Sequence, residues 1–169
     1  ATKIEVTIEG AGTTLIEVAD DGHGIPIDEI SVALARHATS KLSTAEDLFR
    51  IETLGFRGEA LASIASVSQF VLTSRNKHSE FGGKINVEGG EIVGEISRVG
   101  VPIGTVVQVS QLFYNVPARL KFLKTPTTER RQIDQLVSRF ALSYPNVRFQ
   151  LIQEGKKSLF TSGNGKRRE

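Results

Sequence analysis

The chain contains no cysteine, methionine or tryptophan among its 169 residues. Without cysteine it can form no disulfide and no thiolate site, and cysteine-based zinc sites are excluded as well. The three histidines, His23, His37 and His78, do not have the spacing of metal ligands. No apolar run approaches the length of a bilayer span, and the first ten residues lack the features of a secretory signal. These absences favour a cytoplasmic protein.

The remaining composition is that of an ordinary soluble domain. Hydrophobic residues make up 39% and charged residues 24% of the chain, which argues against a disordered or collagen-like protein. A length of 169 residues supports one core and not two large ones, so we expect a single domain. The net charge of +2 is too small to direct the whole chain to nucleic acid. Because position 1 is alanine, we expect Ala1 to be internal to a longer protein or exposed by processing.

Several short segments alternate apolar and polar side chains, which is the period of a half-buried strand. Residues 3–9 and 14–19 form the first two predicted strands, and Gly10-Ala11-Gly12 between them predicts a hairpin. Glycine-containing turns separate several of the other predicted strands, which are residues 68–74, 84–87, 91–97, 105–112, 147–153 and 157–161. We expect these strands to form an antiparallel or mixed sheet.

Three segments show helical patterns. Asp28 can cap a helix that continues through Ala35, and the small residues of 58–66 predict a second helix. Residues 128–143 carry apolar side chains at the spacing of one helical face, namely Ile133, Leu136, Val137 and Phe140. Strands and helices occur in runs and not as repeated βαβ units. The pattern therefore predicts an α+β fold, a two-layer sandwich of helices on a sheet.

The loop DDGHGI at 20–25 follows the second predicted strand directly. Asp20 at the end of that strand can accept a hydrogen bond from an exocyclic amine, as on a nucleotide base. Gly22 and Gly24 would let a flat ring approach the backbone closely. A surface turn rich in aspartate and glycine is the alternative interpretation of these residues.

A second loop, GFRGEAL at 55–61, places two glycines around an arginine just before a helical segment. A helix that begins at Gly58 presents unpaired N–H groups, and Arg57 adds a full positive charge, so a phosphate would be stabilised there. A glycine N-cap beside a solvated arginine is the alternative. Lys41 could add an ammonium group to this site, although a solvated loop is the more frequent role of such residues. Neither the dinucleotide-binding fingerprint nor the Walker A motif is present.

Positive charge is concentrated between residues 115 and 148, a segment that contains seven lysines and arginines but only two acidic residues. Arg130 and Arg131 lie at the centre of this stretch and are candidates for contacts to the phosphate backbone of DNA. A solvated helix face is the alternative, because no set of aromatic residues for base stacking accompanies the charges.

Four segments together resemble the MutL mismatch-repair ATPases, which belong to the GHKL superfamily of gyrases, Hsp90 chaperones and histidine kinases. These segments are DDGHGI, RHATSK at 36–41, GFRGEAL, and LFYNVPARLKFLK at 112–124. The resemblance covers essentially the whole chain. It implies a GHKL-type α+β sandwich with a mixed, mostly antiparallel sheet over residues 1–162, and a linker toward a second domain at 163–169.

The resemblance also implies a set of ATP-binding residues. Asp20 would bind the adenine amine, Gly22 and Gly24 would shape the base pocket, and Thr105 would support the adenine contact. The phosphates would be held by Lys41, Arg57, Gly58, Glu59, Ala60 and Leu61. Asp21 stands where the family usually has asparagine. The family's general-base glutamate and its magnesium-binding asparagine would lie upstream of residue 1, so we expect this chain alone to hydrolyse ATP poorly or not at all.

For function, the resemblance implies an ATP-gated dimerising clamp that couples mismatch recognition to repair, with ATP and Mg²⁺ as cofactors. Its partners would be mismatched duplex DNA, a mismatch-recognition protein of the MutS type and a second copy of the chain, with no membrane. Its location would be the cytoplasm, in association with a bacterial nucleoid. The alternative is a module of the same fold that binds DNA or protein without ATP, through the basic stretch.

Overall fold

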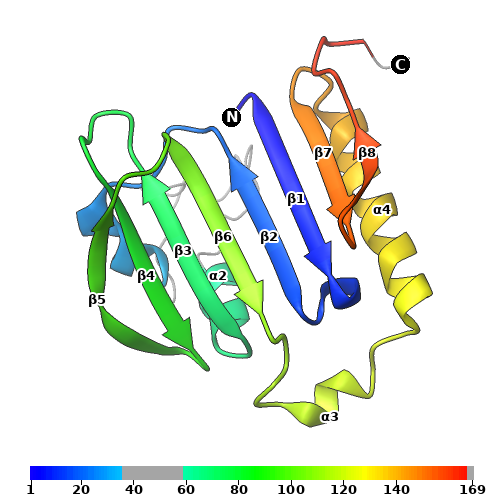
Figure 1. Cartoon of the computed structure of the whole chain (residues 1–169), viewed down its shortest axis with the longest axis horizontal. Coiled ribbons are helices and arrows are strands. Elements are labelled where there is room, and N and C mark those ends of the chain that lie inside the picture. Colours follow the sequence, from blue (N-terminus) through cyan, green and yellow to red (C-terminus); the bar gives the residue numbers. More distant parts are fainter. Residues whose placement is uncertain (36–58, 167–169) are drawn as a thin grey trace, which may run out of the picture.

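The computed structural model describes residues 1–35 and 59–166. Eight strands form one sheet in the order β5-β4-β3-β6-β2-β1-β7-β8. Figure 1 shows this sheet nearly face-on, with α2 behind it and α4 beside β7 and β8. Helices α1, α2 and α4 pack on one face of the sheet, as the two-layer sandwich predicted, whereas α3 lies beyond the ends of the strands.

The strands match the segments that the alternation predicted to within about two residues at most ends. They are β1 (Lys3–Glu9), β2 (Leu15–Asp20), β3 (Gln69–Arg75), β4 (Gly82–Glu88), β5 (Glu91–Val99), β6 (Gly104–Ser110), β7 (Arg148–Gln153) and β8 (Lys156–Phe160). The α-helices are α1 (Ile30–Ala33), α2 (Ala60–Ala65), α3 (Pro117–Leu120) and α4 (Pro126–Ser143), and the 3-10 turns are η1 (Gly10–Gly12) and η2 (Ile27–Glu29).

The sheet is mixed because of one parallel pair. β1 pairs antiparallel with β2 on one side and parallel with β7 on the other, where Lys3 lies opposite Arg148. Every other neighbouring pair of strands is antiparallel. This arrangement confirms the predicted mixed, mostly antiparallel sheet.

Two apolar clusters hold the helices on the sheet. In one cluster, Ile30 of α1 and Ala65 of α2 pack on Phe70 and Leu72 of β3, together with further residues of β4 and β6. In the other cluster, α4 packs on β1 and β7. Its buried residues are Val137 and Ala141 of α4, Ile8 of β1, and Phe149 and Leu151 of β7. The partly buried Ile16 of β2 contacts both clusters, which shows that they share one face of the sheet.

The face of α4 that meets the sheet differs from the predicted one. Val137 and Ala141 are buried and Ile133 packs against them, whereas Leu136 is 55% and Phe140 37% exposed. The helix carries apolar residues over a wider arc than one stripe, and the pattern alone could not decide which side of that arc faces the sheet. The predicted packing of Leu136 and Phe140 is therefore wrong.

The first predicted helix is also shorter than expected. A 3-10 turn, η2, leads into the four-residue α1, and the side chain of Asp28 makes no capping hydrogen bond. The helix α4 does have a side-chain cap, because the Thr125 hydroxyl accepts a hydrogen bond from the N–H of Thr128 at 3.3 Å.

The opposite face of the sheet is largely polar. Gln108 donates a hydrogen bond of 2.7 Å to Glu17, and Gln150 donates one of 3.2 Å to Glu5. The ammonium of Lys3 lies 3.0 Å from the Glu5 carboxylate. In the described residues, no helix is long and apolar enough to cross a membrane.

Candidate functional site

Asp20 ends β2 on the face of the sheet that carries the helices. Residue pairing places Asp20 opposite Thr105 of β6, and Thr105 in turn opposite Ser74 of β3. Cross-strand partners point to the same face, with their Cβ atoms about 5 Å apart. Phe70 and Leu72 lie in the buried cluster and alternate with less buried neighbours, so Ser74 is on the side of β3 that meets the helices. Its cross-strand neighbours Thr105 and Asp20 face the same way.

The Asp20 carboxylate uses one of its oxygens within the loop. Its Oδ1 accepts a hydrogen bond of 2.7 Å from the N–H of Gly22. Its Oδ2 has no hydrogen bond to any residue in the described part of the chain. The loop therefore fixes the orientation of the carboxylate and leaves one strong acceptor available to a ligand.

Glycines of this loop and of the β6 start sit where a side chain would not fit. A Cβ on Gly22 would lie 2.7 Å from Oδ1 of Asp20, and one on Gly24 would lie 1.9 Å from the carbonyl oxygen of Arg75. A Cβ on Gly104 would lie 2.0 Å from the carbonyl oxygen of Asp20. These close approaches bring the loop and the strand ends together around Asp20.

A hydroxyl network stands next to Asp20. The N–H of Ile25 donates a hydrogen bond of 2.8 Å to the hydroxyl of Ser74, which lies 2.8 Å from the hydroxyl of Thr105. The Ser74 hydroxyl also donates to the carbonyl oxygen of Gly104 at 2.9 Å. Ser74 is 1% exposed. The network ties the loop after β2 to the start of β6, so both sides of the site are held together.

Sequence reasoning did not identify Ser74. The signal that could have found it lies in β3, where Phe70, Leu72 and Ser74 occupy the buried positions of an alternating strand. A serine at such a position must satisfy its hydroxyl inside the protein.

The sheet beside Asp20 is not fully covered. Val18 precedes Asp20 by two residues on the same face of β2, and its side chain is 36% exposed. The neighbouring Val107 of β6, which pairs with Val18, is only partly buried. The carboxylate and the Thr105 hydroxyl thus border an apolar surface, which is the combination that binds a flat heterocycle.

Asp21 has a different role from Asp20. Its carboxylate accepts hydrogen bonds from the Thr2 hydroxyl, from the Thr2 N–H at 2.6 Å and from the Lys3 N–H at 2.8 Å. These bonds, the Thr2 hydroxyl first among them, lower the pKa of Asp21 to about 2. The residue that departs from the family's asparagine therefore anchors the start of β1 and leaves the Asp20 carboxylate in place.

The predicted phosphate residues are described only in part. Lys41, Arg57 and Gly58 lie outside the described residues. Glu59 precedes α2, which begins at Ala60 and not at Gly58, and Leu61 packs against the cluster under β3. Among the described residues, no hydrogen bond or ion pair joins Ala60 or Leu61 to the group around Asp20. Of the predicted ATP-binding residues, the structure thus brings together Asp20, Gly22, Gly24 and Thr105.

Many known proteins are similar to this chain. No protein-family model matches the chain. Among curated proteins, the DNA mismatch repair protein MutL of Dictyoglomus turgidum is 53% identical over 166 residues, which are 98% of this chain and 29% of that protein. The chain belongs to the MutL family. The MutL protein of Lactococcus lactis subsp. cremoris is 46% identical over 169 residues, which are 100% of this chain and 26% of that protein.

Solved MutL structures share the fold. The Aquifex aeolicus MutL ATPase domain complexed with ADP superposes with a TM-score of 0.75 at 40% identity, over 97% of this chain and 57% of that one. This likeness confirms the predicted GHKL-type sandwich. The chain spans less than a third of the two curated MutL relatives and little more than half of the ATPase domain.

Two cavities lie near the ends of the sheet in this MutL-family chain. One, of about 300 Å³, is lined by Asp20 and Thr105 and also by Glu5, Ala19 and Val106. The last three alternate with Asp20 and Thr105 along their strands, so this cavity opens mainly on the polar face, behind the hydroxyl network.

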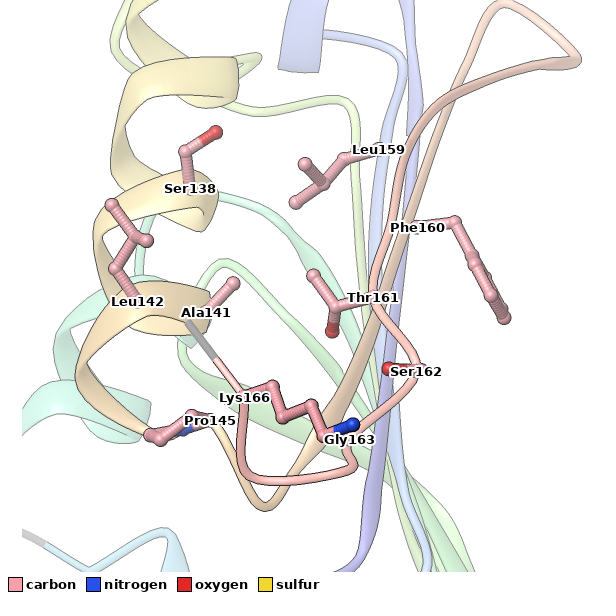
Figure 2. Close-up of a pocket in the computed structure, with 10 residues that line it drawn as sticks. All are labelled: Ser138, Ala141, Leu142, Pro145, Leu159, Phe160, Thr161, Ser162, Gly163 and Lys166. Atoms are coloured by element: carbon pink, nitrogen blue, oxygen red, sulfur yellow. The ribbon is translucent and has the colours of Figure 1, made fainter. Parts of the chain in front are cut away.

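The other cavity, of about 360 Å³, lies between the second half of α4 and the end of β8. Figure 2 shows Ala141 of α4 on the side of the helix toward Leu159 and Thr161, while Phe160 points to the other side of its strand. None of the predicted site residues in the described part of the chain lines this cavity. It is therefore separate from the site around Asp20.

The two candidate DNA contacts differ in their surroundings. Arg130 lies 3.9 Å from Glu154, in the turn after β7, and is half-buried. Arg131 is exposed on α4 and has no ion pair among the described residues. Only Arg131 thus presents its full charge to solvent.

Proposed function

We propose that the chain binds ATP on the helix-bearing face of the sheet, with the adenine at the end of β2. The observation that carries this proposal is the Asp20 carboxylate, which is held by the Gly22 N–H through one oxygen and has no hydrogen bond from the described residues on the other. The ADP complex of the Aquifex aeolicus MutL ATPase domain, of the same fold, supports an adenine nucleotide as the ligand.

The residues around Asp20 fit an adenine ring. The exocyclic amine donates to Oδ2 of Asp20, and the ring lies on the exposed side chain of Val18. Gly22 and Gly24 keep the loop thin, because a side chain at either position would collide with the Asp20 carboxylate or the Arg75 backbone. Base recognition then needs no movement of the strands.

The phosphates extend away from this end of the sheet. Lys41, Arg57 and Gly58, with the backbone of Glu59, Ala60 and Leu61, are our proposed phosphate contacts. The described residues contain no group of three or more acidic or histidine side chains that could hold a metal ion. We therefore assign Mg²⁺ to no residue in the described part, although it would stabilise the phosphate charge when bound.

In the whole protein, ATP binding would promote dimerisation and ATP hydrolysis would reverse it, so that the dimer acts as a clamp on DNA during mismatch repair. A mismatched duplex and a MutS-type protein are the proposed partners, and the bacterial cytoplasm is the proposed location. The names of the MutL relatives support a role in mismatch repair.

The Asp20→Asn substitution tests the adenine assignment. Replacing a charged acceptor with an amide costs about 1.5–3 kcal/mol of hydrogen-bond energy, so affinity for a non-hydrolysable ATP analogue should fall by roughly 10- to 100-fold in calorimetry. Glu17→Gln is the matched control, because it removes the same charge from the same strand on the polar face, where Glu17 bonds to Gln108. Equal affinities for wild type and Asp20→Asn would show that Asp20 does not bind the adenine, whereas no binding of the analogue by wild type would favour the ATP-independent interaction module.

A further inference from the structure

We propose that Ser74 is a positioning residue that sets the specificity of the base pocket for a 6-amino purine over a 6-oxo purine. It would do so by holding the Thr105 hydroxyl as a hydrogen-bond acceptor. This inference rests on the proposed nucleotide site, and it concerns a residue that does not touch the ligand itself.

The contacts of Ser74 determine the direction of its hydrogen bonds. A serine hydroxyl has one proton and two lone pairs. The Ile25 N–H takes one lone pair at 2.8 Å. The carbonyl oxygen of Gly104, at 2.9 Å, can only accept, so that contact requires the Ser74 proton. One lone pair of Ser74 then remains for the Thr105 hydroxyl, 2.8 Å away.

The Thr105 proton must therefore point at Ser74. The opposite assignment would give the Ser74 proton to Thr105 and leave two oxygens, those of Ser74 and Gly104, facing each other at 2.9 Å without a proton between them. Burial prevents water from relieving that repulsion, since Ser74 is 1% exposed. The favourable chain runs from Thr105 through Ser74 to the Gly104 carbonyl.

As a consequence, the side of the pocket formed by Asp20 and Thr105 presents only hydrogen-bond acceptors to the ligand. Thr105 turns its lone pairs outward, and Asp20 beside it offers the carboxylate oxygen that the loop does not use. The two Cβ atoms are about 5 Å apart across the strands, so one amino group can donate one hydrogen to each acceptor. A 6-oxo group has no hydrogen to donate and meets two acceptors, which is repulsive.

Ligand selectivity tests this inference. We would measure the affinities of the protein as encoded for ATP and for ITP, which carries oxygen in place of the amine, under conditions without turnover. Wild type should prefer ATP by about tenfold, since the 6-oxo group of ITP meets two acceptors and has no hydrogen to donate to either of them. In Ser74→Ala the Thr105 hydroxyl is released and can donate to the oxo group, so the ATP-to-ITP ratio should fall by about tenfold.

A matched control separates selectivity from stability. Ser68 is fully buried, and its hydroxyl donates a single hydrogen bond of 2.8 Å to the carbonyl of Ile64, before the start of β3. Ser68→Ala should lower stability and leave the selectivity ratio at its wild-type value. If Ser74→Ala does not fold, Ser74→Cys keeps the side-chain shape with a slightly larger atom that is a much weaker donor and acceptor, and the same fall in the ratio is expected.

Each result decides a different claim. Wild-type selectivity in a folded Ser74→Ala or Ser74→Cys protein overturns the role of Ser74 and leaves the nucleotide site standing. If wild type shows no preference for ATP over ITP, the claim that Asp20 and Thr105 present only acceptors to the ligand is wrong. If wild type binds neither nucleotide, the proposed function fails, and this inference fails with it.

Discussion

A Cβ atom on Gly24 would lie 1.9 Å from the carbonyl oxygen of Arg75, far inside the distance at which these atoms can coexist. Gly24 also has a φ of 69°, in the left-handed region. The loop after β2 thus presses its backbone directly against the end of β3.

Gly24→Ala should therefore be strongly destabilising. The left-handed backbone alone costs about 1–2 kcal/mol for alanine, and the collision with Arg75 should raise the loss of unfolding free energy to about 3 kcal/mol or more. Gly155→Ala is the control, because Gly155 has a φ of 72° and no atom within 4 Å of a Cβ. Denaturant unfolding of both variants measures the difference, and equal losses would show that the close approach does not exist.

Asp21 should make stability depend on acid. Hydrogen bonds from the Thr2 hydroxyl and the Lys3 N–H lower its pKa from 3.8 to about 2 in the folded protein. Since the folded pKa is the lower one, this contribution is present above about pH 4 and is lost as the pH falls toward 2. Asp21→Asn should lower the free energy of unfolding at neutral pH. Between pH 4 and pH 2, the unfolding free energy of this variant should fall less steeply than that of wild type.

Asp28→Asn is the comparison for that experiment. Asp28 is exposed and makes no hydrogen bond within the described residues. Acid titration followed by circular dichroism should show the wild-type profile for Asp28→Asn. An unchanged profile for Asp21→Asn would mean that its carboxylate does not anchor the start of β1.

The two apolar sides of α4 should respond differently to truncation. Val137 is 8% exposed against the sheet, so Val137→Ala should lower the unfolding free energy by about 2 kcal/mol. Leu136 is 55% exposed, and Leu136→Ala should cost less than about 1 kcal/mol even though more carbon is removed. Thermal or urea unfolding ranks the two, and the reverse order would place α4 on its other face.

If the basic stretch at 115–148 binds DNA, the affinity for duplex DNA should depend on the salt concentration. Arg131 is exposed, so Arg131→Ala should reduce the slope of log affinity for duplex DNA against log salt by about one. Arg130 already faces Glu154 at 3.9 Å, and Arg130→Ala should have a smaller effect. Arg98 in β5, at the far edge of the sheet, provides an exposed control that should leave the slope unchanged. Unaltered slopes in both α4 variants would remove this helix from the DNA contact.

Much of the sheet could be predicted from local patterns. Alternation located β3, β4 and β7 because buried residues alternate with more exposed ones along each of these strands, and glycines marked several of the turns. The parallel pairing of β1 with β7 could not be predicted, because no local signal connects residues more than a hundred positions apart. Helix α3, only four residues long, has too few turns to show a period.

The site was predicted where its chemistry lies in a contiguous motif. Asp20 and its glycines stand within six residues, and the strand end explains why the carboxylate is accessible. The role of Ser74 could not be predicted from the sequence, because its partners Ile25 and Thr105 come from distant segments and meet only when the strands pair. A buried hydroxyl acquires its role from those neighbours and not from its own sequence context.

The parallel pairing of β1 with β7 also bears on how the chain folds. β1 cannot gain its second partner strand until residues near position 150 have been synthesised and brought back to it. Loops of this length must close before the pairing returns any free energy, which slows folding in domains dominated by distant contacts. During synthesis, the edge of β1 that will receive β7 stays exposed, so this edge is where we expect a nascent chain to be most prone to aggregation and to need a chaperone.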